Sequence, residues 1–144
     1  MKIFIAADHN GYKLKKYIIK NLKGYEIEDL GTDSTESVDY TDFAFDLCKK
    51  VLKNNTLGIV ICGTGIGMSI ACNKVKGIRC AKVNSQREAY LTRNDNDSNV
   101  IALSSHISEK RVINILKTFL ETPTSIEEKH KRRINKIKEY EKSN

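Results

Sequence analysis

The feature that most constrains this fold is a set of five short apolar runs, separated by longer segments with helical periodicity. The clearest run, residues 57–62, is almost entirely apolar and has no polar face to turn toward solvent. The other runs cover residues 2–7, 25–30, 78–83 and 99–103. Strands that are apolar on both faces are typical of a parallel sheet with helices on both sides. We therefore predict an α/β fold, a three-layer α/β/α sandwich around a five-stranded parallel sheet.

The intervening segments predict the helices of the two outer layers. We expect one helix after the first run, helices over residues 38–53 and 65–73, a fourth opened by a capping box at residues 85–88, and a fifth over residues 108–121. On the first helix we expect the lysines Lys13, Lys16 and Lys20 to face outward.

Pro123 interrupts the chain before a basic C-terminal helix. A second capping box, residues 125–128, is expected to open that helix over residues 126–142. Its predicted apolar line consists of Ile126, Ile134, Ile137 and Tyr140. Beside that line, basic side chains share one stripe: Lys129, Arg133 and Lys136.

Length and composition narrow the class of protein. A chain of 144 residues predicts one domain, residues 1–144, with residues 124–144 forming the C-terminal helix. No apolar run is long enough for a membrane span, and the N-terminus does not read as a secretory signal, so we expect a cytoplasmic protein. The formal net charge of +7 fits an anionic partner, such as a phosphorylated metabolite or RNA, or serves solubility alone.

The four cysteines show no CxxC pair and no zinc spacing with histidine. Three of them, Cys48, Cys72 and Cys80, are expected to be small buried hydrophobic residues. Cys62 differs, because it ends the most apolar run and begins a glycine-rich turn.

Residues 62–67, Cys-Gly-Thr-Gly-Ile-Gly, are the most informative segment for function. Alternate glycines let successive backbone N–H groups converge on a small anion at a helix N-terminus. The spacing is neither the dinucleotide fingerprint nor a Walker loop. At the mouth of this turn, the helix dipole and the amides favour a thiolate on Cys62. The alternative is that Cys62 is only the last buried residue of its strand.

Polar residues also follow the other predicted strands, where ligands bind in parallel sheets. Asp8 and His9 follow the first run, and Ser104, Ser105 and His106 follow the fifth. Each has a purely structural alternative, such as capping of a helix by Asp8. The same holds for the polar run of residues 93–99, which resembles an ordinary loop, and for the basic helix, which resembles a solvated face.

Taken together, these motifs resemble the B-type ribose-5-phosphate isomerases, in the family shared with galactose-6-phosphate isomerase. The resemblance covers essentially the whole chain. Its marks are Ala7-Asp8-His9-x-Gly11, Asp39-Tyr40, Ile61 with the Cys-Gly-Thr-Gly-Ile-Gly turn, Asn73-Lys74, Gly77-Ile78-Arg79 and Asn96-Asp97-Ser98-Asn99-Val100.

The resemblance implies an aldose–ketose isomerase of the pentose phosphate pathway and carbohydrate metabolism. Its substrates would be D-ribose 5-phosphate and D-ribulose 5-phosphate, with no metal or organic cofactor and no nucleic-acid or membrane partner. It further implies a Rossmann-like fold and a homodimer, possibly a tetramer, with the active site at the subunit interface.

The resemblance also assigns roles to individual residues. Cys62 would move the proton between carbons 1 and 2, and the amides of Gly63, Thr64, Gly65, Ile66 and Gly67 would cradle the enediolate. Thr64 and Asp95 are further candidate catalytic residues. The sugar or its phosphate would contact Asp8, His9, Tyr40, Asn96, His106, Lys129 and Arg133.

Three positions depart from the family pattern. Asp95 stands where the family has the histidine that opens the sugar ring, His106 replaces an arginine, and Lys129 replaces another arginine and loses its bidentate fork. Asp95 would act as an acid only if burial or Asp97 favoured its protonated form. Otherwise His9 or His106 supplies the proton, or the ring opens in solution.

Two other functions remain open at this point. One is an isomerase of allose 6-phosphate or galactose 6-phosphate. The other is an RNA-binding or regulatory module that uses the basic C-terminal helix, although only Tyr140 offers an aromatic platform near that helix.

Overall fold

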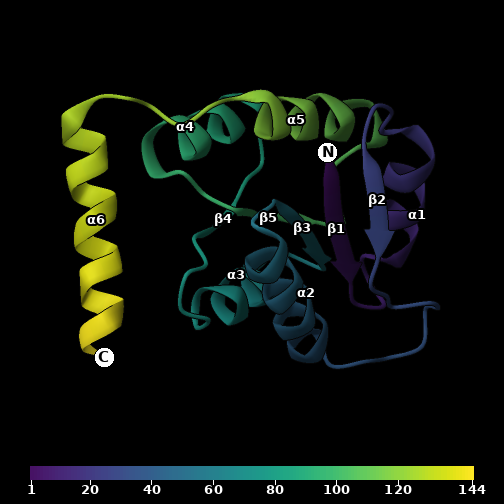
Figure 1. The fold of residues 1–144 in the computed structure, drawn as a ribbon. Helices are drawn as coiled ribbons and strands as arrows, with labels where there is room; N and C mark the ends of the chain where they lie inside the picture. Colours follow the sequence, from purple (N-terminus) through teal and green to yellow (C-terminus); the bar gives the residue numbers. More distant parts are fainter.

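The computed structural model describes all 144 residues and contains one five-stranded parallel sheet (Figure 1). The strand order is β2-β1-β3-β5-β4. The strands are β1 (Lys2–Ala7), β2 (Glu26–Asp29), β3 (Gly58–Cys62), β4 (Cys80–Lys82) and β5 (Val100–Ser104). The predicted five-stranded parallel sheet is confirmed, although β4 is three residues shorter than the run of residues 78–83.

Helices cover both faces of this sheet, as expected for an α/β/α sandwich. On one face lie α1 (Tyr12–Asn21) and α5 (Glu109–Glu121), with α4 (Gln86–Asn96) packed beside α5. On the other face lie α2 (Tyr40–Asn54) and α3 (Ile66–Asn73). The last helix, α6 (Glu128–Ser143), projects beside the sandwich and does not cover either face (Figure 1). No helix of this structure is long and apolar enough to cross a membrane.

Alternation along the strands divides the core into two clusters. In β3, Ile59 and Ile61 pack toward α1 and α5, whereas Val60 and Cys62 pack toward α2 and α3. Both sets are buried because both faces of the sheet are covered, which is why the run showed no polar alternation. Cys62 is therefore directed at the helix that begins after its own glycine turn.

One buried lysine carried no sequence signal. Lys13, Lys16 and Lys20 of α1 are exposed as expected, but Lys15 is fully buried. Its Nζ donates to Asp29 Oδ1 at 2.6 Å and to the carbonyl of Thr32 at 2.7 Å. A buried ammonium needs such partners, and this one joins α1 to the end of β2.

The capping box predicted for the C-terminal helix is wrong. Ser125 Oγ accepts from the N–H of Glu127 in a local turn, and α6 begins at Glu128 with no side-chain cap. The predicted apolar line is also mostly exposed, since only Ile134 is buried and Ile126 is 86% exposed. By contrast, the first capping box is present: Ser85 Oγ accepts from the N–H of Glu88, and Glu88 Oε1 accepts from the N–H of Asn84.

Candidate active site

The loops that follow β1 and β3 meet at the point where the strand order reverses. Chain connections from β1 lead outward to β2, whereas β3 lies on the other side of β1, and ligands bind at such switch points. A Cβ on Gly11 would lie 2.7 Å from the carbonyl oxygen of Ile61, and one on Gly63 would lie 3.4 Å from Asn10 Nδ2. The missing side chains of these two glycines let the loops pack against each other.

The glycine turn holds a set of backbone amides without partners. Gly65 has a φ of +79°, and Ile66 N–H donates to Thr64 Oγ1 at 3.2 Å. The carbonyl of Gly63 is fixed from behind by Ser104 Oγ at 2.8 Å. No acceptor in the chain takes the remaining amide hydrogens, which belong to Gly63, Thr64, Gly65 and Gly67. Together with the N-terminus of α3, they form a preorganised site for a small anion.

Cys62 lies at the base of this turn, only 5% exposed. Its carbonyl accepts from the N–H of Ser105 at 2.9 Å, which ties the end of β3 to the segment after β5. The thiol belongs to the apolar cluster between the sheet and helices α2 and α3, close to the start of α3. The burial expected of a strand end is therefore present, and the catalytic role of Cys62 stays a prediction.

The other three cysteines form the interior of the same cluster. All four cysteines are free thiols. Contact with Cys72, together with burial, raises the pKa of Cys48. Cys48 lowers the pKa of Cys72, but Cys80 and burial raise it by more. Cys48 and Cys72 thus remain protonated and serve as packing residues, as predicted.

Asp8 and His9 are both held by backbone groups beside the turn. Asp8 Oδ1 accepts from the N–H groups of Asn10 and Gly11, each at 3.0 Å, so this oxygen shapes the turn that precedes α1. The N-cap of α1 is Gly11, with no side-chain cap, so the expected capping by Asp8 is not found. The second oxygen has no partner in the chain. His9 Nδ1 accepts from the N–H of Val38 at 3.2 Å, so the hydrogen of its neutral ring lies on Nε2.

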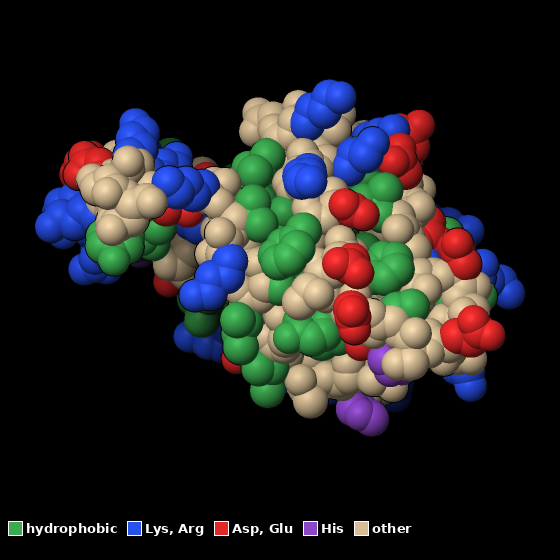
Figure 2. All heavy atoms as spheres, turned by 90° about the horizontal axis from the view of Figure 1, so that it is seen from below, with side chains coloured by type: hydrophobic (Ala, Val, Ile, Leu, Met, Phe, Trp, Pro, Cys, Tyr) green, Lys and Arg blue, Asp and Glu red, His purple; other side chains and the backbone are tan.

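Tyr40 and His106 complete the predicted residues at this edge. A Cβ on Gly67 would lie 2.8 Å from the ring of Tyr40, so the first residue of α2 rests on the glycine turn. His106 is exposed after β5, and its N–H donates to Ser104 Oγ. Figure 2 shows this edge from below, with hydrophobic side chains gathered over α2 and α3. These include the exposed side chains of Tyr40, Phe45, Ile66 and Ile70.

The remaining predicted residues lie at the opposite edge. Asp95 and Asn96 end α4, just before β5 begins at Val100, and Lys129 and Arg133 are exposed on α6. Within one chain, the structure therefore does not bring these four residues to Cys62. The predicted site is divided into a glycine-turn half, at the carboxyl ends of the strands, and an α4–α6 half, at their amino ends.

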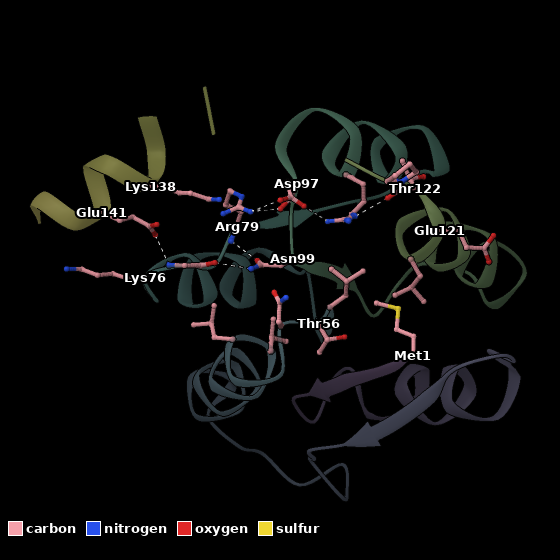
Figure 3. A pocket seen from close by; sticks show the side chains of 18 of the residues that line it. Met1, Thr56, Lys76, Arg79, Asp97, Asn99, Glu121, Thr122, Lys138 and Glu141 are labelled. Carbon is pink, nitrogen blue, oxygen red and sulfur yellow. Dashed lines mark hydrogen bonds and ion pairs between the residues drawn. The ribbon is translucent and has the colours of Figure 1, made fainter. Parts of the chain in front are cut away.

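A cavity of ≈ 790 Å³ also lies at the amino edge, between α6 and the sandwich (Figure 3). Its two arginines, Arg79 and Arg93, share one carboxylate, that of Asp97, and also donate to backbone carbonyls, so their N–H groups are engaged within the chain. Glu141 of α6 accepts from the N–H of Gly77 across it. The cavity contains no cysteine and no glycine turn with unpartnered amides, so the glycine turn beside Cys62 is the better candidate for chemistry. No group of three or more metal-ligating side chains is present.

Comparison with known proteins shows the family of this chain. Residues 3–137 match the family model described as Ribose/Galactose Isomerase. A curated relative from Mycoplasma genitalium, a probable ribose-5-phosphate isomerase B, is 44% identical over 97% of this chain and 95% of its own.

Solved structures show the same fold. Ribose-5-phosphate isomerase B from Clostridium thermocellum superposes with a TM-score of 0.94 at 43% identity, covering 99% of both chains. The Mycoplasma genitalium enzyme with bound ribulose 5-phosphate superposes with a TM-score of 0.92 at 44% identity, covering 99% of this chain and 97% of that one. On the match of nearly its whole length, this chain belongs to the ribose/galactose isomerase family.

Proposed function

We propose that this protein interconverts D-ribose 5-phosphate and D-ribulose 5-phosphate. The observation that carries the proposal is the glycine turn at the switch point, with its unpartnered amides beside Cys62, in a chain of this family. Two similar proteins bear the name ribose-5-phosphate isomerase B, and one of them was solved with ribulose 5-phosphate bound.

The chemistry required is the movement of one proton between neighbouring carbons. Cys62, as thiolate, takes the proton from C2 of the open-chain aldose, while electrons move into the C1 carbonyl to give an enediolate. The thiol then returns the proton to C1, the hydroxyl proton on O2 passes to O1, and the carbonyl forms at C2. The enediolate oxygens accept from the amides of residues 63–67, fixed dipoles that need no reorganisation as charge develops.

The α4–α6 half binds the rest of the substrate. Arg133 and Lys129 hold the phosphate, Arg133 through two parallel N–H donors and Lys129 as a point charge. Asn96, with Asp8, His9, Tyr40 and His106 of the other half, contacts the sugar hydroxyls and phosphate. Asp95 is neither buried nor paired with Asp97, which is held by Arg79 and Arg93, so we assign it the role of a carboxylate base. Its Oδ2, which has no partner in the chain, takes the anomeric hydroxyl proton in ring opening, and the ring oxygen takes a proton from water.

A second copy of the chain brings the two halves together. Three features support a homodimer: the opposite edges of the two halves, the exposed apolar side chains of α3, and those of α6. Ile70 is 57% exposed beside the glycine turn, and Tyr140 and Ile137 are exposed on α6. Apolar patches of this kind, next to an incomplete site, suit burial in an interface.

Side-by-side kinetics test the substrate. Ribose 5-phosphate, allose 6-phosphate and galactose 6-phosphate are each incubated with the protein, and ketose formation is followed. We expect the largest kcat/KM for ribose 5-phosphate. A larger value for either hexose phosphate would replace the substrate assignment, and no turnover of any of them would refute the isomerase proposal.

Mixing two variants that are each nearly inactive at substrate concentrations far below KM tests the divided site, so activity is compared there as kcat/KM. In a Cys62→Ser and Arg133→Ala heterodimer, one of the two sites carries no substitution. An equimolar, randomly paired mixture should therefore regain about a quarter of the unmodified activity. A mixture of Cys62→Ser with Cys62→Ala is the control and should regain nothing. If the first mixture also stays inactive although its subunits exchange, both halves belong to one chain.

A further inference from the structure

Helix α6 rests on the sandwich through very few buried side chains. His130 and Ile134, one turn apart, are its only buried residues. His130 faces the end of α4, the element that carries Asp95. The contact between the two elements is therefore centred on an ionisable ring.

The ring of His130 lies between two carboxylates and is too far from each to form a hydrogen bond. Its Nε2 is 3.7 Å from Asp95 Oδ1, and its Nδ1 is 3.6 Å from Glu127 Oε2. The residue is only 9% exposed, and buried Nδ1 has no hydrogen-bond partner. A neutral ring carries one hydrogen, so one of its two nitrogens faces a carboxylate without a donor. A packing residue needs no such arrangement.

Asp95 is held on one side and free on the other. Oδ1 accepts from Asn94 Nδ2 at 2.8 Å and faces His130, while Oδ2 has no partner. The side chain is 37% exposed, so Oδ2 is accessible to a ligand. Asn94 therefore holds Oδ1 by a hydrogen bond and His130 lies against the same oxygen, which leaves Oδ2 free.

We propose that His130 is a positioning residue for the ring-opening step, acting through Asp95. This inference rests on the proposed isomerase function and on the role given there to Asp95. His130 itself does not touch the substrate. It packs against the Asp95 carboxylate, with its Nε2 3.7 Å from Oδ1, so that Oδ2 meets the closed furanose in one geometry. Small displacements of such a group cost activity even when the fold is intact.

Two substitutions at one position separate positioning from packing. His130→Phe keeps the ring volume and removes both nitrogens, and His130→Gln keeps a side-chain N–H donor. With ribose 5-phosphate, we expect His130→Phe to lower kcat/KM by about 10–100-fold, mostly through kcat, and His130→Gln to recover most of it. Ile134→Val is the matched control, because it trims the packing of α6 without touching Asp95, and it should leave kcat unchanged.

Two further readouts respond only to a ring-opening defect. If His130→Phe handles only open-chain aldose, its rate with ribose 5-phosphate will stop rising with enzyme concentration once spontaneous ring opening limits the reaction. The rate of the unmodified enzyme will continue to rise in proportion to its concentration. In an Asp95→Asn background, His130→Phe should cause little additional loss, because both changes remove the same effect.

The outcomes distinguish this inference from the proposed function. Full activity of His130→Phe, or additive losses in the double variant, would overturn the positioning role while leaving the isomerase in place. No turnover by the unmodified chain would contradict the proposed function itself and the inference with it. Melting temperatures of all variants identify any that lose activity by unfolding. If His130→Phe is one of them, the activity of the folded His130→Gln variant tests the positioning role instead.

Discussion

The two halves of the proposed site are built in different ways. The glycine-turn half stands on the ends of β1, β3 and β5, and hydrogen bonds join its segments: Gly63 to Ser104, Asp8 to Ile61, and Val38 to His9. The α4–α6 half depends on a helix that leaves the sandwich and is held through His130, Ile134 and Glu141. Rigid strand ends carry the half with the thiol and amides, and the projecting helix carries the cations.

This difference shows which half of the proposed site needs precisely placed groups. Enediolate stabilisation requires amides fixed to within fractions of an ångström, and buried strands supply that. A phosphate carries charge on several oxygens, so binding it tolerates a longer and less constrained support. Substitutions in the first half should therefore lower kcat, and cation substitutions in the second should mainly raise KM.

The largest effect is expected at Cys62. Cys62→Ser replaces the proposed base by a hydroxyl that does not ionise near neutral pH, and kcat should fall by about 10²–10⁴-fold. The melting temperature should change little, because the replacement is nearly isosteric. Cys48→Ala, in the same apolar cluster, is the control and should keep its kcat. Near-normal turnover by Cys62→Ser would remove this residue as the base.

The next effect concerns the amide cradle. Gly65→Ala places a Cβ 3.0 Å from the backbone of Leu103 at a φ of +79°, so the turn must shift. Misplacing one such donor should reduce kcat by about 10²–10³-fold. Gly24→Ala imposes a similar φ of +93° but meets nothing within 4 Å, which makes it a matched control for backbone strain. If both variants lose kcat equally, the amides of the turn have no special role.

The contrast between the halves also explains what could be predicted from the sequence. The burial of β3 is a local property of six residues, and the glycine spacing is a local property of the turn, so the fold and the first half were predictable. The register that opposes Cys62 to Ser104 was not, because it depends on pairing between distant strands.

The second half was harder to predict, for physical reasons. Periodicity suggested that the apolar line of α6 faces the body, but a helix that projects leaves Ile137 and Tyr140 exposed. His130 was overlooked because a histidine within a basic run looks solvated. Its spacing of four residues from Ile134 was the one signal of a shared buried face. Lys15 was equally hidden, since its partners Asp29 and Thr32 come from another element.

A moderate effect is expected for the cations of α6. Arg133→Ala removes a charge-assisted pair with the phosphate, worth roughly 1.5–3 kcal/mol, and should raise KM about 10–100-fold with little change in kcat. Arg132→Ala removes the same charge from the adjacent exposed position and should leave KM within about twofold. Steady-state kinetics of both variants decide the matter, and equal KM values would show that only the total charge of the helix counts.

The smallest effect is expected at the interior thiols of Cys48 and Cys72, which should react very slowly with an alkylating reagent. Iodoacetamide reacts with thiolates, and the pKa of Cys48 and of Cys72 is raised, so the thiolate fraction of each at pH 8 is lower than for an ordinary cysteine. In the native protein, modification of Cys62 should accompany the loss of activity, while Cys48 and Cys72 stay unmodified until guanidinium unfolds the chain. Peptide mass spectrometry over time measures each site separately. Alkylation of Cys48 or Cys72 in the native protein as fast as that of Cys62 would mean that the apolar cluster opens readily. It would also mean that the position of Cys62 at the glycine turn does not raise the reactivity of its thiol.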